Sequence, residues 1–163
     1  MRRQSGITLV ELLVTLAVIG IMVGVVFPGF RGLMDRNNLV TTANALVLAT
    51  SYARSEALRG VGFVCVQARG ATPSWGQGWQ VVTDCVVGGG DVIRVFEPIA
   101  DALTLTASDG ITQLGFNNQG LLQDGTPRTF TLCLPGDSGV RISVAATGRP
   151  STEGVDATVC PAS

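Results

Sequence analysis

The sequence predicts an α+β fold in which one long N-terminal helix packs on a small C-terminal antiparallel β domain. Three observations predict it. An apolar segment opens the chain, an apolar repeat of three- and four-residue steps follows it, and short β-branched runs separated by Gly, Asp and Asn fill the rest. The 163 residues suit one domain plus an appendage, and a mean hydropathy of +0.40 is high for a soluble domain.

The first predicted element is a helix able to span a membrane. Leu12–Phe30 is an uncharged run of 19 residues, and at about 1.5 Å per residue such a helix nearly crosses a hydrocarbon core of about 30 Å. Arg2 and Arg3 precede the run, so the positive-inside rule places the N-terminus in the cytoplasm and the rest of the chain on the far side.

Two other interpretations of this segment are a secretory signal peptide and a plain signal anchor. A signal peptide needs a small-x-small cleavage site after its apolar stretch, and residues 25–28 (VVFP) offer none. A signal anchor fits the length but leaves Glu11 unexplained, because an ionised carboxylate in hydrocarbon costs several kcal/mol unless something neutralises it. For Glu11 itself, the simplest alternative is a side chain that snorkels to the membrane surface.

The helix is expected to continue past the membrane to Arg59 as an amphipathic helix whose apolar stripe packs on the rest of the chain. Gly60 is expected to end it as a C-cap, and Pro28 to bend it near the membrane boundary. From Ile7 to Arg59, at 1.5 Å per residue, it would be about 80 Å long. The stripe consists of Leu39, Ala43, Leu46, Val47, Thr50, Ala53 and Ala57.

From Val61 onward the pattern predicts seven short strands in an antiparallel β domain. The SWGQG stretch at 74–78 is expected to be a loop, and the pattern leaves open whether the strands form one sheet or two. The strands are expected near residues 61–68, 78–84, 92–97, 103–107, 112–117, 128–134 and 139–146, with turns at 88–91, 117–120 and 135–139. The two Trp residues are interpreted as core or hairpin-packing groups, with a binding role as the alternative.

The four cysteines all follow the membrane segment and allow three pairings. The sequence-near pairing is favoured, because Cys65 with Cys85 would close the first hairpin and Cys133 with Cys160 would tie the C-terminal tail to a late strand. Each loop of about 20 to 30 residues would contribute roughly 3 kcal/mol in the chain-entropy treatment. Such bonds persist in an oxidising compartment. Buried free thiols are the alternative.

The residue inventory argues against an enzyme. The chain contains no His and no Lys, which excludes histidine triads, histidine zinc sites and histidine acid–base chemistry. There is no Gly-x-Ser-x-Gly elbow and no phosphate-binding loop, and the acidic residues are scattered singly. We therefore expect no catalytic residue, no metal and no cofactor. The net charge of -1 predicts no non-specific attraction to nucleic acid or anionic lipid.

The residues from Gly6 to Glu11 resemble the class III signal of type IV prepilins and pseudopilins. The shared features are a short basic leader ending in Gly, an apolar stretch, and Glu at the fifth mature position. The resemblance implies that a prepilin peptidase cuts between Gly6 and Ile7 on the cytoplasmic face, and that the new terminus at Ile7 is then N-methylated. Residues 1–6 would be the cleaved leader, 7–30 the transmembrane and assembly half of the helix, and 31–163 the globular pilin domain.

Cleavage would give Glu11 a partner. The new amine at Ile7 is cationic and lies one helical turn from Glu11, so Glu11 can neutralise its own terminus or that of a neighbouring subunit. The resemblance implies the neighbour, and Glu11 would then set the register for adding one subunit to a filament.

Several stretches of the globular part together resemble the GspH/FimT family of minor pilins and pseudopilins, which has the type IV pilin-like fold. They are residues 53–57 (ARSEA), 75–79 (WGQGW) with Asp84, 116–120, and 141–144 leading to Thr147-Gly148-Arg149. The resemblance implies a minor pilin that helps initiate and assemble the type IV pilus in a priming or tip complex. A pseudopilin of a type II secretion system is one alternative.

The resemblance also implies partners and a location. The partners would be other minor pilins, the major pilin and the prepilin peptidase. Before assembly the protein would be a single-pass inner-membrane protein with a periplasmic C-terminal domain, and afterwards part of the pilus tip outside a Gram-negative bacterium.

A DNA-binding tip pilin for natural transformation is the other alternative. Members with that role use a Gly-Arg-x-Arg motif near the C-terminus, and here Gly148-Arg149-Pro150-Ser151 supplies only the first Arg. The candidate DNA contacts are Arg128, Arg141, Gly148 and Arg149. Loss of Arg2 and Arg3 with the leader leaves nine basic and twelve acidic side chains, so binding would be modest and sensitive to salt. Solvated Arg side chains on strand faces are the favoured interpretation.

Overall fold

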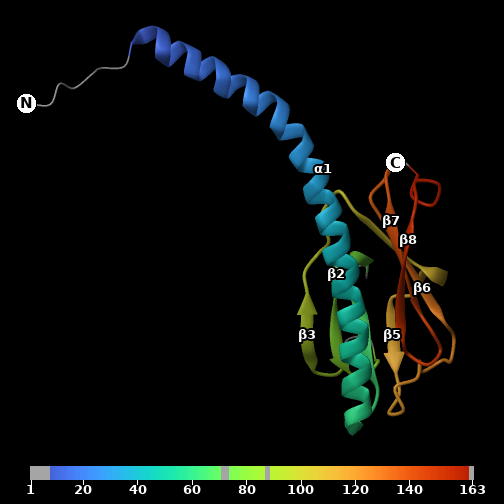
Figure 1. Ribbon diagram of the computed structural model, residues 1–163. Helices are drawn as coiled ribbons and strands as arrows, with labels where there is room; N and C mark the ends of the chain where they lie inside the picture. Colours follow the sequence, from blue (N-terminus) through green and yellow to red (C-terminus); the bar gives the residue numbers. More distant parts are fainter. Residues whose placement is uncertain (1–7, 71–73, 87–88, 162–163) are drawn as a thin grey trace, which may run out of the picture. The chain divides into compact units, whose positions relative to one another are not determined.

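The computed structural model describes residues 8–70, 74–86 and 89–161, and for residues 23–29, 31 and 61 it describes the backbone but not the side chain. The chain divides into two compact units, Met1–Met34 (unit 1) and Asp35–Ser163 (unit 2). One helix, α1, Leu9–Glu56, has 48 residues, beginning in unit 1 and ending in unit 2 (Figure 1). The long N-terminal helix is therefore confirmed, while the bend at Pro28 stays a prediction.

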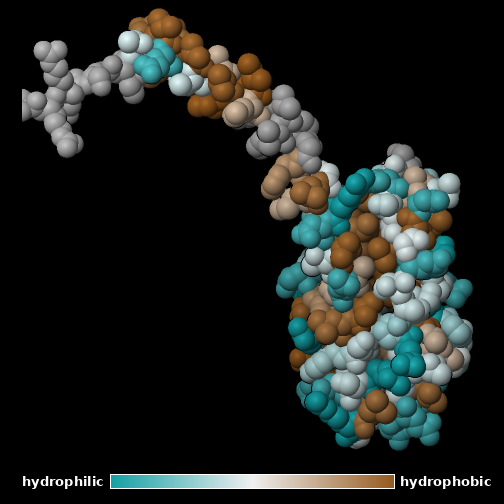
Figure 2. Space-filling view, viewed as in Figure 1, coloured by the Kyte–Doolittle hydropathy of each residue, from teal (hydrophilic) through white to brown (hydrophobic). Residues whose placement is uncertain are grey.

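In unit 1 the described side chains of α1 are mostly apolar (Figure 2). The large apolar side chains among them are 46% (Val18) to 76% (Leu9) exposed, so the described part of unit 1 leaves much of their apolar surface uncovered. Among the residues that the structure describes, no helix combines the length and the apolar character that a membrane crossing needs.

The end of α1 lies close to where the sequence predicts it. The α-helix ends at Glu56, and one π-helical turn, Ala57–Val61, follows. Gly60 adopts φ +85° in this turn, a left-handed conformation that ends helices and that glycine adopts without a Cβ penalty. The α-helix is three residues shorter than predicted because its last turn widens before the chain reverses.

The described residues of unit 2 form eight strands in two antiparallel four-stranded sheets. Sheet 1 has the order β3-β2-β1-β5 and sheet 2 the order β4-β6-β7-β8. The strands are β1, Val64–Arg69; β2, Ser74–Thr83; β3, Val92–Phe96; β4, Thr104–Ala107; β5, Gln113–Phe116; β6, Arg128–Cys133; β7, Gly139–Val144; and β8, Pro150–Val155. A 3₁₀ turn, Ser108–Gly110, follows β4. The question of one sheet or two is thus answered: there are two.

Two predictions about the strands were wrong. SWGQG is not a loop but the first half of β2, and the pairing of β1 with β2 is irregular there, with Ala68 opposite Trp79 and Arg69 opposite Ser74. β8 was not predicted at all. It begins with Pro150 and carries mostly exposed polar residues or Gly, so it lacks the β-branched enrichment that identified the other strands.

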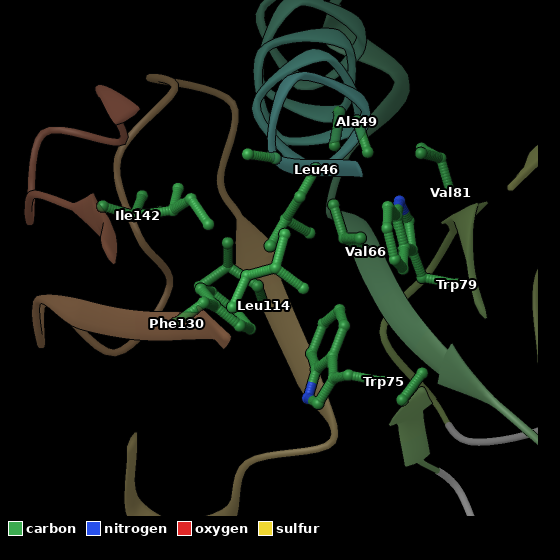
Figure 3. Close-up of a cluster of buried hydrophobic side chains, with 14 of the residues drawn as sticks. Leu46, Ala49, Val66, Trp75, Trp79, Val81, Leu114, Phe130 and Ile142 are labelled. Carbon is green, nitrogen blue, oxygen red and sulfur yellow. The ribbon is translucent and has the colours of Figure 1, made fainter. Parts of the chain in front are cut away.

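The core of unit 2 lies between α1 and the two sheets (Figure 3). The predicted stripe on α1 is confirmed: Val47 packs partly buried against this core, and the other six members are at most 5% exposed. The two sheets meet through Trp75 of β2 and Phe130 of β6, whose rings pack edge to face with centroids 4.8 Å apart. The stripe on α1 and both sheets therefore share one hydrophobic core.

Two disulfides join Cys65 to Cys85 and Cys133 to Cys160, with sequence separations of 20 and 27 residues. This is the sequence-near pairing that the sequence analysis favoured. The first bond ties the start of β1 to the residue after Asp84, and the second ties the end of β6 to the C-terminal tail. Both bonds link segments whose backbones are already close, since Val64 pairs with Thr83, and Gly136 donates to the carbonyl oxygen of Cys160.

Candidate functional site

The predicted processing and assembly residues lie at the start of the chain. Gly6 and Ile7 are outside the described residues, so the cleavage site stays a prediction. Glu11 is described: it lies exposed in the first turn of α1, and its backbone N–H donates to Oγ1 of Thr8 at 3.3 Å. Thr8 thus caps the helix, and the carboxylate of Glu11 is placed where the helix dipole favours negative charge.

Three of the stretches that carry the family resemblance meet at one place in unit 2, around Arg54. Its Nε donates to the carbonyl oxygen of Gly120 at 2.9 Å. Arg54 comes from α1, Gly120 from the loop after β5, and Gly148 from the turn between β7 and β8. A Cβ built on Gly148 would lie 2.3 Å from the Gly120 carbonyl oxygen and 3.1 Å from Cδ of Arg54. We refer to these three residues as the Arg54 junction.

The Arg54 junction assigns a structural task to one of the predicted DNA contacts. Gly148 is buried and adopts φ +74°, so its packing against Gly120 and its left-handed backbone both require glycine. Gly120 adopts φ +71°, and a Cβ there would lie 3.1 Å from the side chain of Leu58. These stretches carry the family resemblance in the sequence, but the sequence predicts no role for Arg54. In the sequence, Arg54 could have been singled out as a charged residue next to Ala53, a member of the apolar stripe.

The WGQGW stretch of β2 packs against the backbone at the end of β3. Trp75 and Trp79 are 4% and 1% exposed, which agrees with the packing role expected for them. Gly78 adopts φ +84°, and a Cβ there would lie 2.5 Å from the carbonyl oxygen of Phe96. The absence of a side chain at Gly78 therefore lets the backbone after β3 approach β2 closely.

The three arginines that the sequence offered as DNA contacts differ in their ion-pair partners. Arg128, on β6, forms ion pairs with Asp124 and with Asp109, the latter at 3.1 Å, and its side chain is only 16% exposed. A backbone hydrogen bond from Thr126 and the hydrogen bond from Arg128 lower the pKa of the Asp124 carboxyl, although partial burial opposes them. Arg128 is therefore already neutralised within the protein.

Arg141 and Arg149 lie at different positions along sheet 2. Arg141 of β7 is directly opposite Glu153 of β8, and the two side chains form an ion pair at 3.5 Å. Arg149 is exposed at the turn before β8 and, in the part of the chain that the structure describes, has no carboxylate within salt-bridge distance. Four residues at about 3.3 Å each separate Arg149 from Glu153 along the chain. Two of the three arginines are thus paired with carboxylates, while Arg149 has no such partner among the described residues.

The described residues contain no group of three or more Cys, Asp and Glu side chains placed to hold a metal ion. The site that the structure builds is accordingly a set of packing and contact surfaces: an apolar helix with Glu11 in its first turn, and a disulfide-bonded β unit.

Comparisons with protein families agree with both the apolar N-terminal helix and the β unit. Residues 42–148 match the family described as type II transport protein GspH, which is more than half of the chain. Residues 1–27 match the prokaryotic N-terminal methylation motif. No curated protein sequence matches the chain.

Solved structures give the same answer for the fold. The crystal structure of the type IV minor pilin FimU of Pseudomonas aeruginosa is 29% identical, with a TM-score of 0.65 and coverage of 74% of this chain and 92% of that chain. A second crystal form of FimU gives 28% identity and a TM-score of 0.62, covering 71% and 92%. The minor pseudopilin EpsH of the type 2 secretion system of Vibrio cholerae is 14% identical, with a TM-score of 0.54 and coverage of 73% and 97%, a likeness of fold alone.

Proposed function

Because the chain belongs to the GspH family of minor pilins and pseudopilins and carries the N-terminal methylation motif, we propose that it helps to initiate and assemble a type IV pilus. The fold supports this, since a long N-terminal helix packed on an antiparallel β unit is the type IV pilin-like fold of FimU and EpsH. The observation that carries the proposal is the joint match: the methylation motif covers 1–27 and the GspH family covers 42–148. This family consists of structural subunits.

Processing is the first step of the proposal. A prepilin peptidase cuts between Gly6 and Ile7, and the new amine of Ile7 is methylated. The match to the methylation motif over residues 1–27 supports this step. Cleavage removes Arg2 and Arg3 and leaves α1 as the N-terminal element of the mature subunit.

Membrane residence is the second step. Before assembly the subunit lies across the inner membrane once, with unit 2 in the periplasm. The run Leu12–Phe30 supports this by its length and lack of charge, and the described side chains of this run up to Met22 include large apolar groups 46% to 68% exposed. The two disulfides suit an oxidising compartment.

Assembly through α1 is the third step. In the bilayer, the carboxylate of Glu11 needs an opposite charge, and the amine at Ile7 of a neighbouring subunit supplies it. Partners are then other minor pilins and the major pilin. The subunit leaves the membrane when its helix joins the helices of the filament, so that it ends in the pilus.

Sequence identity to the solved relatives supports a pilus, although the matching family is named for type II transport. Identity to the pilus subunit FimU is 29%, against 14% to the secretion subunit EpsH. The disulfides suit either machine, because they persist both in the periplasm and outside the cell. A type II secretion pseudopilin would share the helix, Glu11 and the β unit, and is the alternative that the experiment below must separate.

The test is incorporation of variants into sheared surface filaments of the native strain, with its own copy of the gene removed. Glu11→Ala should be cleaved and held in the membrane but absent from filaments. Thr15→Ala is the matched control, because Thr15 is exposed one turn further along α1 and its Oγ1 donates within the helix, to the carbonyl oxygen of Leu12. Normal incorporation of Glu11→Ala would rule out the assembly role. Wild-type protein that is absent from pili but required for protein secretion would assign it to a secretion machine.

A further inference from the structure

The outer edge of β5, an edge strand of sheet 1, is only partly paired. The backbone N–H of Ala68 donates to the carbonyl oxygen of Thr112 at 2.8 Å, so the backbone groups of Thr112 face β1. Successive residues of an antiparallel strand direct these groups to opposite edges, and those of Gln113 therefore face away from β1. Gln113 is opposite Gln67 in a pair without backbone hydrogen bonds, and no other described residue bonds to its N–H or carbonyl oxygen.

The protein's own chain begins a strand on this outer edge and then leaves it. The N–H of Gln123 donates to the carbonyl oxygen of Gly115 at 2.9 Å, and residues 121–123 lie antiparallel to β5. A turn closed by the N–H of Gly125 then carries the chain away from the edge. The added strand therefore stops before it reaches Gln113, although the edge itself continues.

A groove lies where this strand stops, and we call it the β5 groove. It is lined by residues 111–115, residues 122–124 and Arg128, and its volume is about 510 Å³. Thr112 and Gln123 in this lining are exposed, so the groove is open to solvent. Unpaired backbone groups at a sheet edge are what an added peptide strand binds. The β5 groove therefore offers both the room and the hydrogen-bonding groups for an extended segment.

The charges beside the β5 groove specify the segment further. Arg128 forms ion pairs with both Asp109 and Asp124, so two carboxylates share one guanidinium and one negative charge is in excess. The Asp109 and Asp124 side chains are 72% and 50% exposed, and an incoming side chain can reach them. Charge complementarity thus favours a segment that carries an Arg or a Lys.

We propose that the free edge of β5 at Gln113 accepts an extended segment of a neighbouring pilin subunit as an additional strand, with an Arg or Lys of that segment paired to Asp109 and Asp124. The proposal rests on the proposed function, because the neighbour is a subunit of the same filament. Two backbone hydrogen bonds and one exposed ion pair are weak alone. Assembly through α1 holds the neighbour close, and the resulting high effective concentration makes such a contact sufficient.

The test places the photo-crosslinking residue p-benzoylphenylalanine at Thr112 in the full-length protein within assembled filaments. Thr112 is exposed in the lining of the β5 groove. Irradiation should link position 112 to another pilin, and mass spectrometry should identify a linked segment that contains Arg or Lys. Gln113→Pro removes the outward N–H without removing a hydrogen bond to β1. Loss of one hydrogen bond should reduce the crosslink about fivefold.

Two control variants separate the backbone pairing from other effects of the proline. Gln113→Ala loses the same side chain but keeps the N–H, and should leave the crosslink unchanged. Thr152→Pro makes the same substitution on β8, an edge strand of sheet 2. The N–H of Ala145 donates to the carbonyl oxygen of Arg149, so by the same alternation the exposed Thr152 faces away from β7. Thr152→Pro should also leave the crosslink unchanged.

A second variant tests the charge and covers the case in which Gln113→Pro does not fold. Asp109→Asn removes the excess negative charge, and Asn tolerates the φ of +57° at this position. It should reduce the crosslink about two- to fivefold. Asp101→Asn is the matched control, because Asp101 is exposed and lies outside the β5 groove, and it should leave the crosslink unchanged.

The outcomes distinguish this docking edge from the pilus role itself. A crosslink that survives either Gln113→Pro or Asp109→Asn in a variant that folds and enters filaments overturns the docking edge. A linked segment without Arg or Lys, or no crosslink from position 112 in filaments that contain the protein, also overturns it. All of these results leave the pilus role intact. Absence of the wild-type protein from filaments overturns the proposed function instead.

Discussion

Nε of Arg54, near the end of α1, donates to the carbonyl oxygen of Gly120, 66 residues further along the chain, at 2.9 Å. Gly148 packs against the same carbonyl oxygen. Gly120 follows β5 of sheet 1, and Gly148 lies between β7 and β8 of sheet 2. The hydrogen bond of Arg54 and the close packing of Gly148 therefore fix the end of the helix against loops from both sheets.

Gly148→Ala should destabilise the fold. The new methyl group would lie 2.3 Å from the Gly120 carbonyl oxygen, at a backbone φ of +74°. Left-handed strain alone costs about 1–3 kcal/mol, and the close contact adds to it. Urea unfolding measures the change. Gly154→Ala is the control, because nothing lies within 4 Å of its Cβ position, and it should stay within about 0.5 kcal/mol of wild type. Equal stability of the two variants would contradict the packing role of Gly148.

Loss of the second disulfide should also destabilise unit 2. Cys133→Ser with Cys160→Ser opens a loop with a sequence separation of 27 residues, and the chain-entropy treatment puts the loss at about 3 kcal/mol. The double variant should therefore unfold at a lower urea concentration than wild type, with the first disulfide intact in both. An unchanged midpoint would mean that the bond adds nothing to stability.

Acid should weaken unit 2 partly through Asp124. Hydrogen bonds from Thr126 and Arg128 lower its pKa in the folded state. The ionised Asp124 carboxylate therefore stabilises the folded state at pH values above the pKa of an unfolded Asp, which is about 3.9. This stabilisation is lost as the pH falls through the lower pKa that the carboxyl has in the folded state. Asp124→Asn should therefore flatten the fall in stability below about pH 4. Unfolding curves from about pH 5 to about pH 2 for both proteins measure it, and parallel curves would contradict the assignment.

DNA binding, if measured, should be weak and should depend on one arginine. Arg128 and Arg141 are engaged by carboxylates, which leaves Arg149 as the candidate contact. For single-stranded DNA, one phosphate contact gives a slope of about -0.7 in a plot of log affinity against log salt. A mobility shift across salt concentrations should show this shallow slope and disappear in Arg149→Ala. A slope of about -2 or steeper would mean that three cationic groups act together.

Cleavage should depend on the small residue before the cut. Gly6→Val adds a β-branched side chain next to the bond between Gly6 and Ile7, and steric hindrance in the peptidase should leave the leader attached. Membrane fractions analysed by mass spectrometry would show the uncut chain. Normal removal of residues 1–6 from this variant would contradict the proposed cleavage site.

The sequence was informative where local pattern decides the structure. The stripe from Leu39 to Ala57 and most strands follow from periodicity, and Gly60 from its position after the last periodic residue. Three features depend on contacts between distant segments and leave no local pattern. They are the division into two sheets, the pairing of β1 with β5 across about 50 residues, and the Arg54 junction. β8 was missed because its exposed Ser, Thr and Glu residues show no apolar alternation, although they pair with β7 in the structure.

Some of the candidate functional residues could likewise be identified from the sequence, whereas the contacts of others needed the structure. Glu11 was found because a charge in an apolar run is visible without a structure. The carboxylate partners of Arg128 and Arg141 appear only when side chains from different elements are placed together. The same holds for the buried N–H of Trp79, which has no acceptor among the described residues. Sequence alone could name the arginines but not their carboxylate partners.

The most direct test of the central claim is the intact mass of the protein recovered from its native membrane, before and after reduction. The account predicts a chain that lacks Met1 to Gly6 and carries one additional methyl group, and whose mass rises by four hydrogens when Cys65–Cys85 and Cys133–Cys160 are reduced. An uncleaved chain, or one cleaved after Phe30, would contradict processing as a pilin and leave a signal-anchored or secreted β domain in its place.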